Sequence, residues 1–329
     1  MSRSKSTTEK TLVHLRRVAL LGRFSLWAGL AVTLALSAPA GKAQSAVTES
    51  AAQASVGHAK RQVVLVTGST DGLGREVAVR LAATGAHIIV HGRNRERGME
   101  VVKEIEQQGK GSARFYAADF ASLEQVRKFA ETILRDYDRL DVLINNAGMR
   151  GPNVAASRQV SSDGYELTFA VNYLSGFLLT RMLLPRLIQS APSRIVSISS
   201  SAQASGTIDF DDVMLERNYT ATQAYRESKL ALVMFTFDLA RELKGTGVIV
   251  SVLQPGSNLR RVLSTGVHPK TPIEYAVDAV FHLVTSPDLE SGQYFDILTP
   301  ARANDQAYDK EAREKLRKLS IQLTGISPY

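Results

Sequence analysis

The segment Val63-Val64-Leu65-Val66-Thr67-Gly68-Ser69-Thr70-Asp71-Gly72-Leu73-Gly74 joins an apolar run to a turn that contains three glycines. The β-branched run predicts a buried strand, and the residues after the turn have the pattern of a helix. Glycines at such a junction let the backbone approach a pyrophosphate, whose charge the free N–H groups at the helix start stabilise. The spacing is Gly-x-x-x-Gly-x-Gly rather than the Gly-x-Gly-x-x-Gly of many dinucleotide folds. The segment predicts a dinucleotide-binding turn, and the alternative is a purely structural turn.

Outward from this segment, short β-branched runs alternate with amphipathic stretches of helix length. Near-continuous apolar strands separated by helices predict a parallel sheet covered on both faces, a doubly wound, Rossmann-like α/β fold in a single domain. The expected strands span residues 63–67, 87–91, 114–117, 140–144, 194–199, 248–253 and 293–295. The expected helices span residues 73–83, 95–107, 123–137, 165–189, 225–243 and 272–284.

Composition narrows the function classes. The 329 residues are 44% hydrophobic and 22% charged, as in a globular protein, and none is cysteine. The absence of cysteine excludes disulfides, thiolate metal sites and cysteine nucleophiles, and no metal site is expected. The net charge of +8 comes mainly from residues 1–60, which hold eight basic residues against Glu9 and Glu49. The rest of the chain is nearly balanced, which argues against a nucleic-acid partner.

The N-terminal segment has the order of a targeting signal. Six basic residues precede an uncharged stretch over residues 24–41, and small residues follow. We expect residues 1–43 to be a signal peptide or a membrane anchor through residues 24–41, with Arg16-Arg17 loosely fitting a twin-arginine signal. The domain is then exported to the periplasm or tethered to a membrane; the alternative is a cytoplasmic extension. Residues 44–59 read as a linker, and the folded domain is expected over residues 60–329.

The end of the second expected strand bears on cofactor choice. It reads His91-Gly92-Arg93-Asn94, with no carboxylate before Glu96. An acidic residue here would bind the ribose hydroxyls of NAD, whereas an arginine can pair with the 2′-phosphate of NADP. We therefore expect NADP, with NAD as the alternative, and Arg93 as a solvated loop residue is the competing interpretation.

Tyr225 and Lys229 are four residues apart in an expected helix, so the phenol and the ammonium lie on one face. A nearby ammonium favours the phenolate form and makes the tyrosine usable as a general acid/base. The pair alone is common by chance, and its significance comes from the motifs around it.

Those motifs resemble the short-chain dehydrogenase/reductase family, in the branch that contains retinol dehydrogenases and their bacterial relatives. The resemblance covers about residues 61–329. Besides the glycine turn, it rests on Asp119-Phe120, Asn145-Asn146-Ala147-Gly148, Asn172-Tyr173-Leu174-Ser175-Gly176-Phe177, Arg194-Ile195-Val196-Ser197-Ile198-Ser199-Ser200, Tyr225-Arg226-Glu227-Ser228-Lys229-Leu230-Ala231 and Pro255-Gly256.

The resemblance implies a role for four catalytic residues. Ser200 would hydrogen-bond the reacting oxygen, Tyr225 would transfer its proton, Lys229 would bind the nicotinamide ribose, and Asn172 would hold a water in a proton relay. Ser199 or Ser201 could replace Ser200, and Asn172 could be an ordinary amide inside a helix. Asn146 to Gly148 could likewise be only a turn.

The resemblance also implies a cofactor-binding set, in which Asp119 lies beside the adenine. The set comprises Gly68, Ser69, Gly72, Leu73, Gly74, Arg93, Asn94, Asp119, Phe120, Asn146, Ala147, Gly148, Tyr225, Lys229, Pro255 and Gly256. One departure is that Ser257-Asn258-Leu259 stands where relatives have a hydrophobic residue and a threonine that contacts the cofactor. The segment that normally forms a substrate lid, residues 257–271, is short and basic.

These observations predict an NADP-dependent oxidoreductase that interconverts an alcohol and its carbonyl on a small, hydrophobic substrate. A homo-oligomer is compatible with the resemblance. One alternative is a carbon–carbon double-bond reductase similar to protochlorophyllide reductase, against which the lack of cysteine counts. The other is a non-catalytic NADP-binding module, which the presence of both Tyr225 and Lys229 disfavours.

Overall fold

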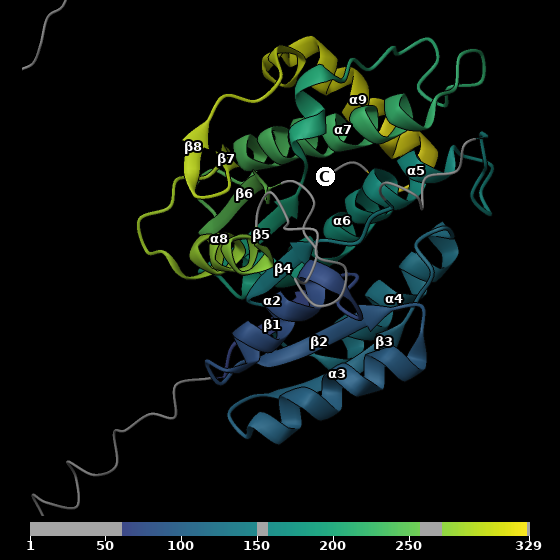
Figure 1. Cartoon of the computed structure of the whole chain (residues 1–329). Coiled ribbons are helices and arrows are strands. Elements are labelled where there is room, and N and C mark those ends of the chain that lie inside the picture. The colour runs from purple at the N-terminus through teal and green to yellow at the C-terminus, as the bar shows by residue number, and fades with distance from the viewer. Residues whose placement is uncertain (1–60, 150–156, 257–271, 328–329) are drawn as a thin grey trace, which may run out of the picture. The chain divides into compact units, whose positions relative to one another are not determined.

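The computed structural model describes residues 61–149, 157–256 and 272–327, and within them an eight-stranded sheet in the order β3-β2-β1-β4-β5-β6-β7-β8 (Figure 1). Every neighbouring pair is parallel except β7 and β8, which are antiparallel. The strands are β1 (Val63–Val66), β2 (His87–Gly92), β3 (Ser112–Ala117), β4 (Val142–Asn145), β5 (Ser193–Ile198), β6 (Val248–Gln254), β7 (Gln293–Asp296) and β8 (Thr299–Ala301). The predicted doubly wound fold is confirmed.

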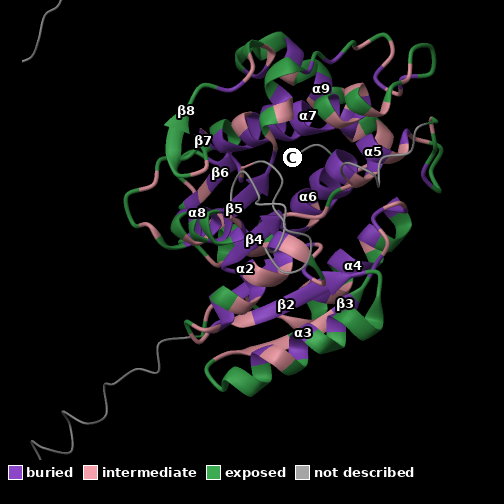
Figure 2. Ribbon diagram, in the orientation of Figure 1, coloured by how far each residue is buried: buried purple, intermediate pink, exposed green. Residues whose placement is uncertain are grey.

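Helices cover both faces of the sheet, and each face has its own apolar core (Figure 2). One core joins the sheet to α2 (Gly72–Ala82), α3 (Arg95–Gln108) and α8 (Ile273–Thr285). The other joins it to α4 (Leu123–Asp136), α6 (Ser175–Gln189), α7 (Ala221–Glu242) and α9 (Lys310–Thr324). β1 and β4 are buried along their whole length, because parallel strands in the centre of such a sheet face helices on both sides.

Side chains at the strand ends start several of these helices. Asp71 accepts a hydrogen bond from the Gly72 amide at the start of α2, and Asn94 accepts one from the Arg97 amide in the first turn of α3. Such N-caps are each worth about 1 kcal/mol, because they satisfy amides that have no partner inside the helix. The glycine turn and the second strand end are therefore fixed locally.

The helix expected over residues 165–189 forms as one continuous helical stretch, Leu167–Gln189, but its hydrogen-bond pattern changes along its length. It divides into α5 (Leu167–Phe169), a π-helical segment η2 (Ala170–Leu174) and α6. Pi-helical insertions are rare and frequently occur at functional sites, and this one contains Asn172. The apolar periodicity of the sequence runs through the insertion and does not reveal it.

Four elements were not expected from the sequence. They are η3 (Ser201–Ser205), η4 (Asp305–Tyr308), β8 and α9. β8 is three exposed residues around a proline, and α9 buries mainly small or polar residues at i, i+4 spacing, so neither has a strong apolar pattern.

Within the described residues, one continuous helical stretch, Leu167–Gln189, is long and apolar enough to cross a membrane. Its most apolar window is 83% buried inside the domain, which identifies it as a core element. The signal or anchor expected over residues 1–43, the linker over 44–59 and the lid over 257–271 lie outside the described residues.

Candidate active site

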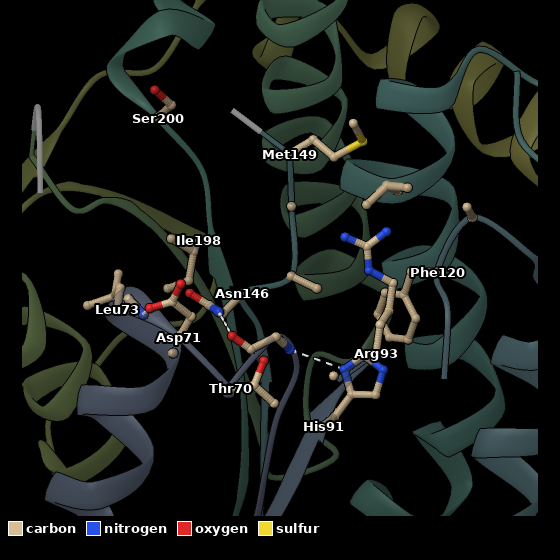
Figure 3. Close-up of a pocket in the computed structure, with 18 of the residues that line it drawn as sticks. Thr70, Asp71, Leu73, His91, Arg93, Phe120, Asn146, Met149, Ile198 and Ser200 are labelled. Atoms are coloured by element: carbon tan, nitrogen blue, oxygen red, sulfur yellow. Dashed lines mark hydrogen bonds between the residues drawn. The ribbon is translucent and has the colours of Figure 1, made fainter. Parts of the chain in front are cut away.

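A cavity of about 520 Å³ lies at the carboxyl ends of the strands, where β1 and β4 are neighbours. The strand order reverses direction at this pair, and ligands of open α/β sheets bind at such a switch point. Figure 3 shows residues of the glycine turn, the ends of β2 and β4 and the segment after β5 surrounding the same space.

The glycine turn is shaped by close backbone approaches that leave no room for side chains. A Cβ on Gly74 would lie 2.4 Å from both the Gly68 carbonyl oxygen and Asn146 Nδ2. Gly68 has φ +63°, and a Cβ there would lie 2.9 Å from Ala147 Cα. Asn146 Nδ2 donates to the carbonyls of Thr67, at 2.8 Å, and Gly68, at 3.1 Å, and so ties the turn to the end of β4. This bare turn at the start of α2 fits the pyrophosphate of a dinucleotide.

Most of the predicted cofactor-binding residues line the cavity. They are Gly68, Gly72, Leu73, Gly74, Arg93, Asp119, Phe120, Asn146, Ala147, Gly148, Tyr225, Lys229, Pro255 and Gly256. Two side chains are engaged elsewhere. Ser69 is fully buried and its hydroxyl donates to the Val66 carbonyl at 2.7 Å, while the Asn94 side chain caps α3.

Two arginines line the cavity near the end of β2, each beside a carboxylate. Arg93 lies 4.0 Å from Asp119, and Arg97 lies 3.6 Å from Asp71. Both guanidinium groups are largely exposed, and ion pairs of this kind contribute little to stability. Arg97 was not predicted from the sequence, although it is a second arginine only four residues after Arg93.

The structure brings Tyr225, Lys229 and Ser200 to the same cavity. Lys229 is 5% exposed, its Nζ donates to the Ile198 carbonyl at 2.9 Å, and it lies 5.9 Å from the centre of the Tyr225 ring. The end of β5 therefore fixes the ammonium against the first turns of α7.

The three consecutive serines after β5 have different surroundings. Ser199 is buried and its hydroxyl donates to the Lys229 carbonyl at 2.9 Å, so its side chain has a structural partner. Ser201 is exposed and does not line the cavity. Ser200 lines the cavity, and its hydroxyl accepts a hydrogen bond from the Ala202 amide at 3.2 Å. Because Ser200 accepts in this hydrogen bond, the bond does not use its hydroxyl proton. This favours Ser200 over Ser199 and Ser201 as the residue that hydrogen-bonds the substrate oxygen.

Asn172 lies beneath the cavity lining and makes three hydrogen bonds. Its Oδ1 accepts from the Met149 amide at 2.6 Å, and its Nδ2 donates to the Met149 carbonyl at 3.1 Å and to Ser228 Oγ at 2.9 Å. A Cβ on Gly148 would lie 3.1 Å from Asn172 Oδ1 and 3.4 Å from Lys229 Nζ. The amide therefore clamps the segment after β4 against α7.

Other lining residues were not predicted from the sequence. Met149, Leu167, Val171 and Ile198 form an apolar part of the wall, and Thr70, Asp71, His91, Gly92, Ala118 and Ala121 line the part near the glycine turn. Apolar residues at strand ends look like core residues in a sequence, so only the fold places them at the cavity. Among the described residues, no group of three histidine or acidic side chains could hold a metal ion.

Comparison with known proteins places this geometry in a family. The family model of short chain dehydrogenases matches residues 62–260. Human retinol dehydrogenase 13 is 39% identical over 290 residues, covering 80% of this chain and 85% of the relative. Human retinol dehydrogenase 14 is 37% identical, covering 80% of this chain and 87% of the relative. The chain belongs to the short-chain dehydrogenase/reductase family.

Solved structures agree with this assignment. A protein from Mycobacterium paratuberculosis has a TM-score of 0.68 and 30% identity, covering 82% of this chain and 96% of that protein. A metagenomic short-chain oxidoreductase in complex with NADP has a TM-score of 0.57 and 27% identity, covering 73% and 98%. The chain is an NAD(P)-dependent oxidoreductase that acts on CH–OH or C=O groups of small molecules, and the glycine turn described above fits its nicotinamide cofactor.

Proposed function

We propose that the protein is an NADP-preferring oxidoreductase that interconverts a hydrophobic alcohol and its carbonyl, with Tyr225 as the general acid/base. The observation that carries the proposal is the cavity itself, where Tyr225, Lys229 and Ser200 share one space with the glycine turn and Arg93. When bound, the nicotinamide cofactor accepts or delivers the hydride.

The chain's own residues supply orientation and proton transfer. Ser200 donates a hydrogen bond to the substrate oxygen and keeps its proton, whereas Tyr225 transfers one proton to that oxygen in reduction or removes it in oxidation. The Lys229 ammonium, held by the Ile198 carbonyl, lies 5.9 Å from the centre of the Tyr225 ring and would bind the cofactor ribose. The residues act together because α7 and the end of β5 hold them within one cavity.

For Asn172 we propose a positioning role. Both ends of its side-chain amide already have protein partners, which supports a clamp on Met149 and α7. The water-holding role expected from the sequence stays a prediction.

The preference for NADP rests on charge. Arg93 and Arg97 line the cavity near the end of β2, and their weak, exposed ion pairs leave them able to turn toward a 2′-phosphate. NADP in the metagenomic relative supports the same preference. The carboxylates Asp71 and Asp119 hold the two guanidinium groups near the cavity without burying their charge.

The hydrophobic substrate class rests on the apolar wall. Met149, Leu167 and Val171 line the cavity that also holds Tyr225, and two relatives are named for retinol, an apolar alcohol. A screen of NADPH- and NADH-dependent reduction, over long-chain aldehydes, retinal and short polar carbonyl compounds, tests the proposal. We expect turnover of the apolar compounds with NADPH; turnover restricted to polar compounds, or cofactor binding without turnover of any compound, would contradict it.

We further propose that residues 24–41 carry the domain to a membrane or across it. Support comes from the basic residues that precede this uncharged stretch. Fractionation of native cells followed by N-terminal sequencing tests this, because an intact Met1 in the soluble cytoplasmic fraction would overturn it. Self-association stays a prediction.

A further inference from the structure

A buried histidine lies directly behind the glycine turn. His91, near the end of β2, is 2% exposed, and its Nδ1 accepts a hydrogen bond from the Gly68 amide at 3.1 Å (Figure 3). The backbone of His91 is paired with the next residue of the turn, because its amide donates to Ser69 Oγ at 3.0 Å and its carbonyl accepts from the Ser69 amide at 2.9 Å. Three hydrogen bonds therefore join Gly68 and Ser69 to one residue of β2.

The imidazole ring has little freedom to move. It stacks on Phe120, with ring centres 4.3 Å apart, and on Phe129, at 4.8 Å. Phe120 and His91 both line the cofactor cavity, and Phe120 follows Asp119, the residue expected beside the adenine. The ring thus connects the turn for the phosphates with the wall for the adenine.

The hydrogen bond defines the protonation state of the ring. Because Nδ1 accepts from an amide, the single proton of the neutral ring lies on Nε2, which is buried. Burial lowers the pKa of His91 to about 3, and the backbone of Ala118 opposes this only in part. A neutral ring at every working pH excludes His91 as a general acid or base.

Burying a polar ring costs free energy, and an apolar residue would fill the space between the two phenylalanines without that cost. An apolar residue cannot, however, accept a hydrogen bond from the Gly68 amide. Gly68 has a left-handed backbone conformation, and this hydrogen bond helps to hold it. We infer that His91 is a positioning residue for the cofactor, whose Nδ1 holds the Gly68 amide and with it the phosphate-binding turn in its receiving conformation. This inference rests on the family's cofactor site and does not depend on the role of Tyr225 or on the preference for NADP.

Two variants separate the acceptor from the ring. His91→Asn can place an amide oxygen where Nδ1 stands, because both atoms are bonded to Cγ, but it loses the stacking. His91→Leu places a methyl group there and keeps more of the apolar contact. We expect His91→Leu to raise the Kd of NADPH, titrated by its fluorescence, about tenfold, and the KM of the cofactor to rise more than kcat falls. The His91→Asn variant should bind NADPH several-fold more tightly than the His91→Leu variant does, even if the Tm of His91→Asn is the lower of the two.

Two results would overturn the inference. One is an equal Kd of NADPH for wild type and His91→Leu, and the other is a loss of NADPH affinity in His91→Asn as large as that in His91→Leu. Titration of NADH alongside NADPH keeps the result independent of cofactor choice. A second measurement needs no variant: the ¹⁵N signals of His91 should be those of the Nε2–H tautomer and should not titrate between about pH 5 and 8. A protonated Nδ1, or a titration in that range, would also overturn it.

Discussion

The Lys229 ammonium lies 5.9 Å from the centre of the Tyr225 ring, and the two residues are one turn apart on α7. Their spacing in the sequence sets the shared face, but the distance depends on β5, whose Ile198 carbonyl accepts a hydrogen bond from Lys229 Nζ. The position of the ammonium beside the ring therefore depends on the packing of α7 against β5 as well as on the spacing in the sequence.

The first prediction concerns the arginines that line the cavity. Arg93→Ala should weaken NADP binding about 10- to 100-fold and leave NAD binding nearly unchanged, because a charge-assisted hydrogen bond to phosphate is worth about 1.5 to 3 kcal/mol. Arg97→Ala should act in the same direction with a smaller effect, since Arg97 lies within the first turn of α3, whereas Arg93 directly follows β2. Titration of both cofactors by calorimetry measures the preference.

Arg95→Ala is the matched control, because Arg95 is exposed at the start of α3 and does not line the cavity. It removes the same charge from the same part of the chain, because Arg95 lies between Arg93 and Arg97 in the sequence. An equal loss of affinity for NADP and NAD, or an equal loss of NADP affinity in Arg95→Ala, would contradict the prediction. Either result would show that the arginines act through their overall positive charge and do not recognise the 2′-phosphate.

The second prediction concerns the Asn172 clamp. Asn172→Ala should lower the free energy of unfolding by about 1 to 3 kcal/mol, because it leaves partly buried backbone groups of Met149 without these partners. It should also lower kcat about 10- to 100-fold through misplacement of the lining residues. Urea unfolding and steady-state kinetics measure the two effects.

Ser228→Ala is the graded comparison, since it removes one of the three hydrogen bonds of Asn172. Its effect on stability should be the smaller of the two. Full activity in Asn172→Ala, with lowered stability only, would reduce the amide to a structural role.

The third prediction concerns Glu227, a buried carboxyl group on α7. Burial, together with Asp209, Asp212 and Glu166, raises the pKa of Glu227 to about 7, while the hydrogen bond from Gln223 opposes the shift. The folded state holds the proton more tightly than the unfolded state, whose pKa is near 4.5. This contribution to stability is therefore complete below about pH 4.5 and is lost as the pH rises through about 7.

Glu227→Gln mimics the protonated group, so the stability of this variant relative to wild type should increase between about pH 5 and 8. We expect a change of about 1 to 2 kcal/mol after allowance for solvent screening. Urea unfolding across that range measures it, with Glu100→Gln, a change at an exposed glutamate of α3, as the control. If the difference in the free energy of unfolding between Glu227→Gln and wild type is the same at all pH values, the raised pKa of Glu227 is contradicted.

The sequence predicts the parallel sheet well because apolar runs such as Val63–Val66 end in glycines and in helix caps such as Asp71. It does not predict the π-helical insertion at Asn172, since an extra residue in a buried helix leaves the apolar pattern almost unchanged. The sequence does not predict the helix α9 either, because the face that α9 buries includes small and polar residues such as Ala312 and Ser320.

The same distinction applies to the site. Glycine spacing and the Tyr225 and Lys229 pair are local signals, and the structure brings them to one cavity. Asn94 shows the limit of local signals, because an asparagine between a strand and a helix can bind a ligand or cap the helix, and here its side chain caps α3. His91 was visible only as a strand residue, and its contact with Gly68 depends on how β1 and β2 pair.

The fourth prediction is the most direct test of the account, because Tyr225→Phe keeps the aromatic ring and removes the transferable proton. The measurement is kcat for NADPH-dependent reduction of an apolar aldehyde, with the Kd of NADPH determined on the same preparations. We expect kcat to fall by about 10² to 10⁴ while the cofactor Kd stays near that of wild type. Near-normal kcat in Tyr225→Phe would contradict the assignment of Tyr225 as the general acid/base.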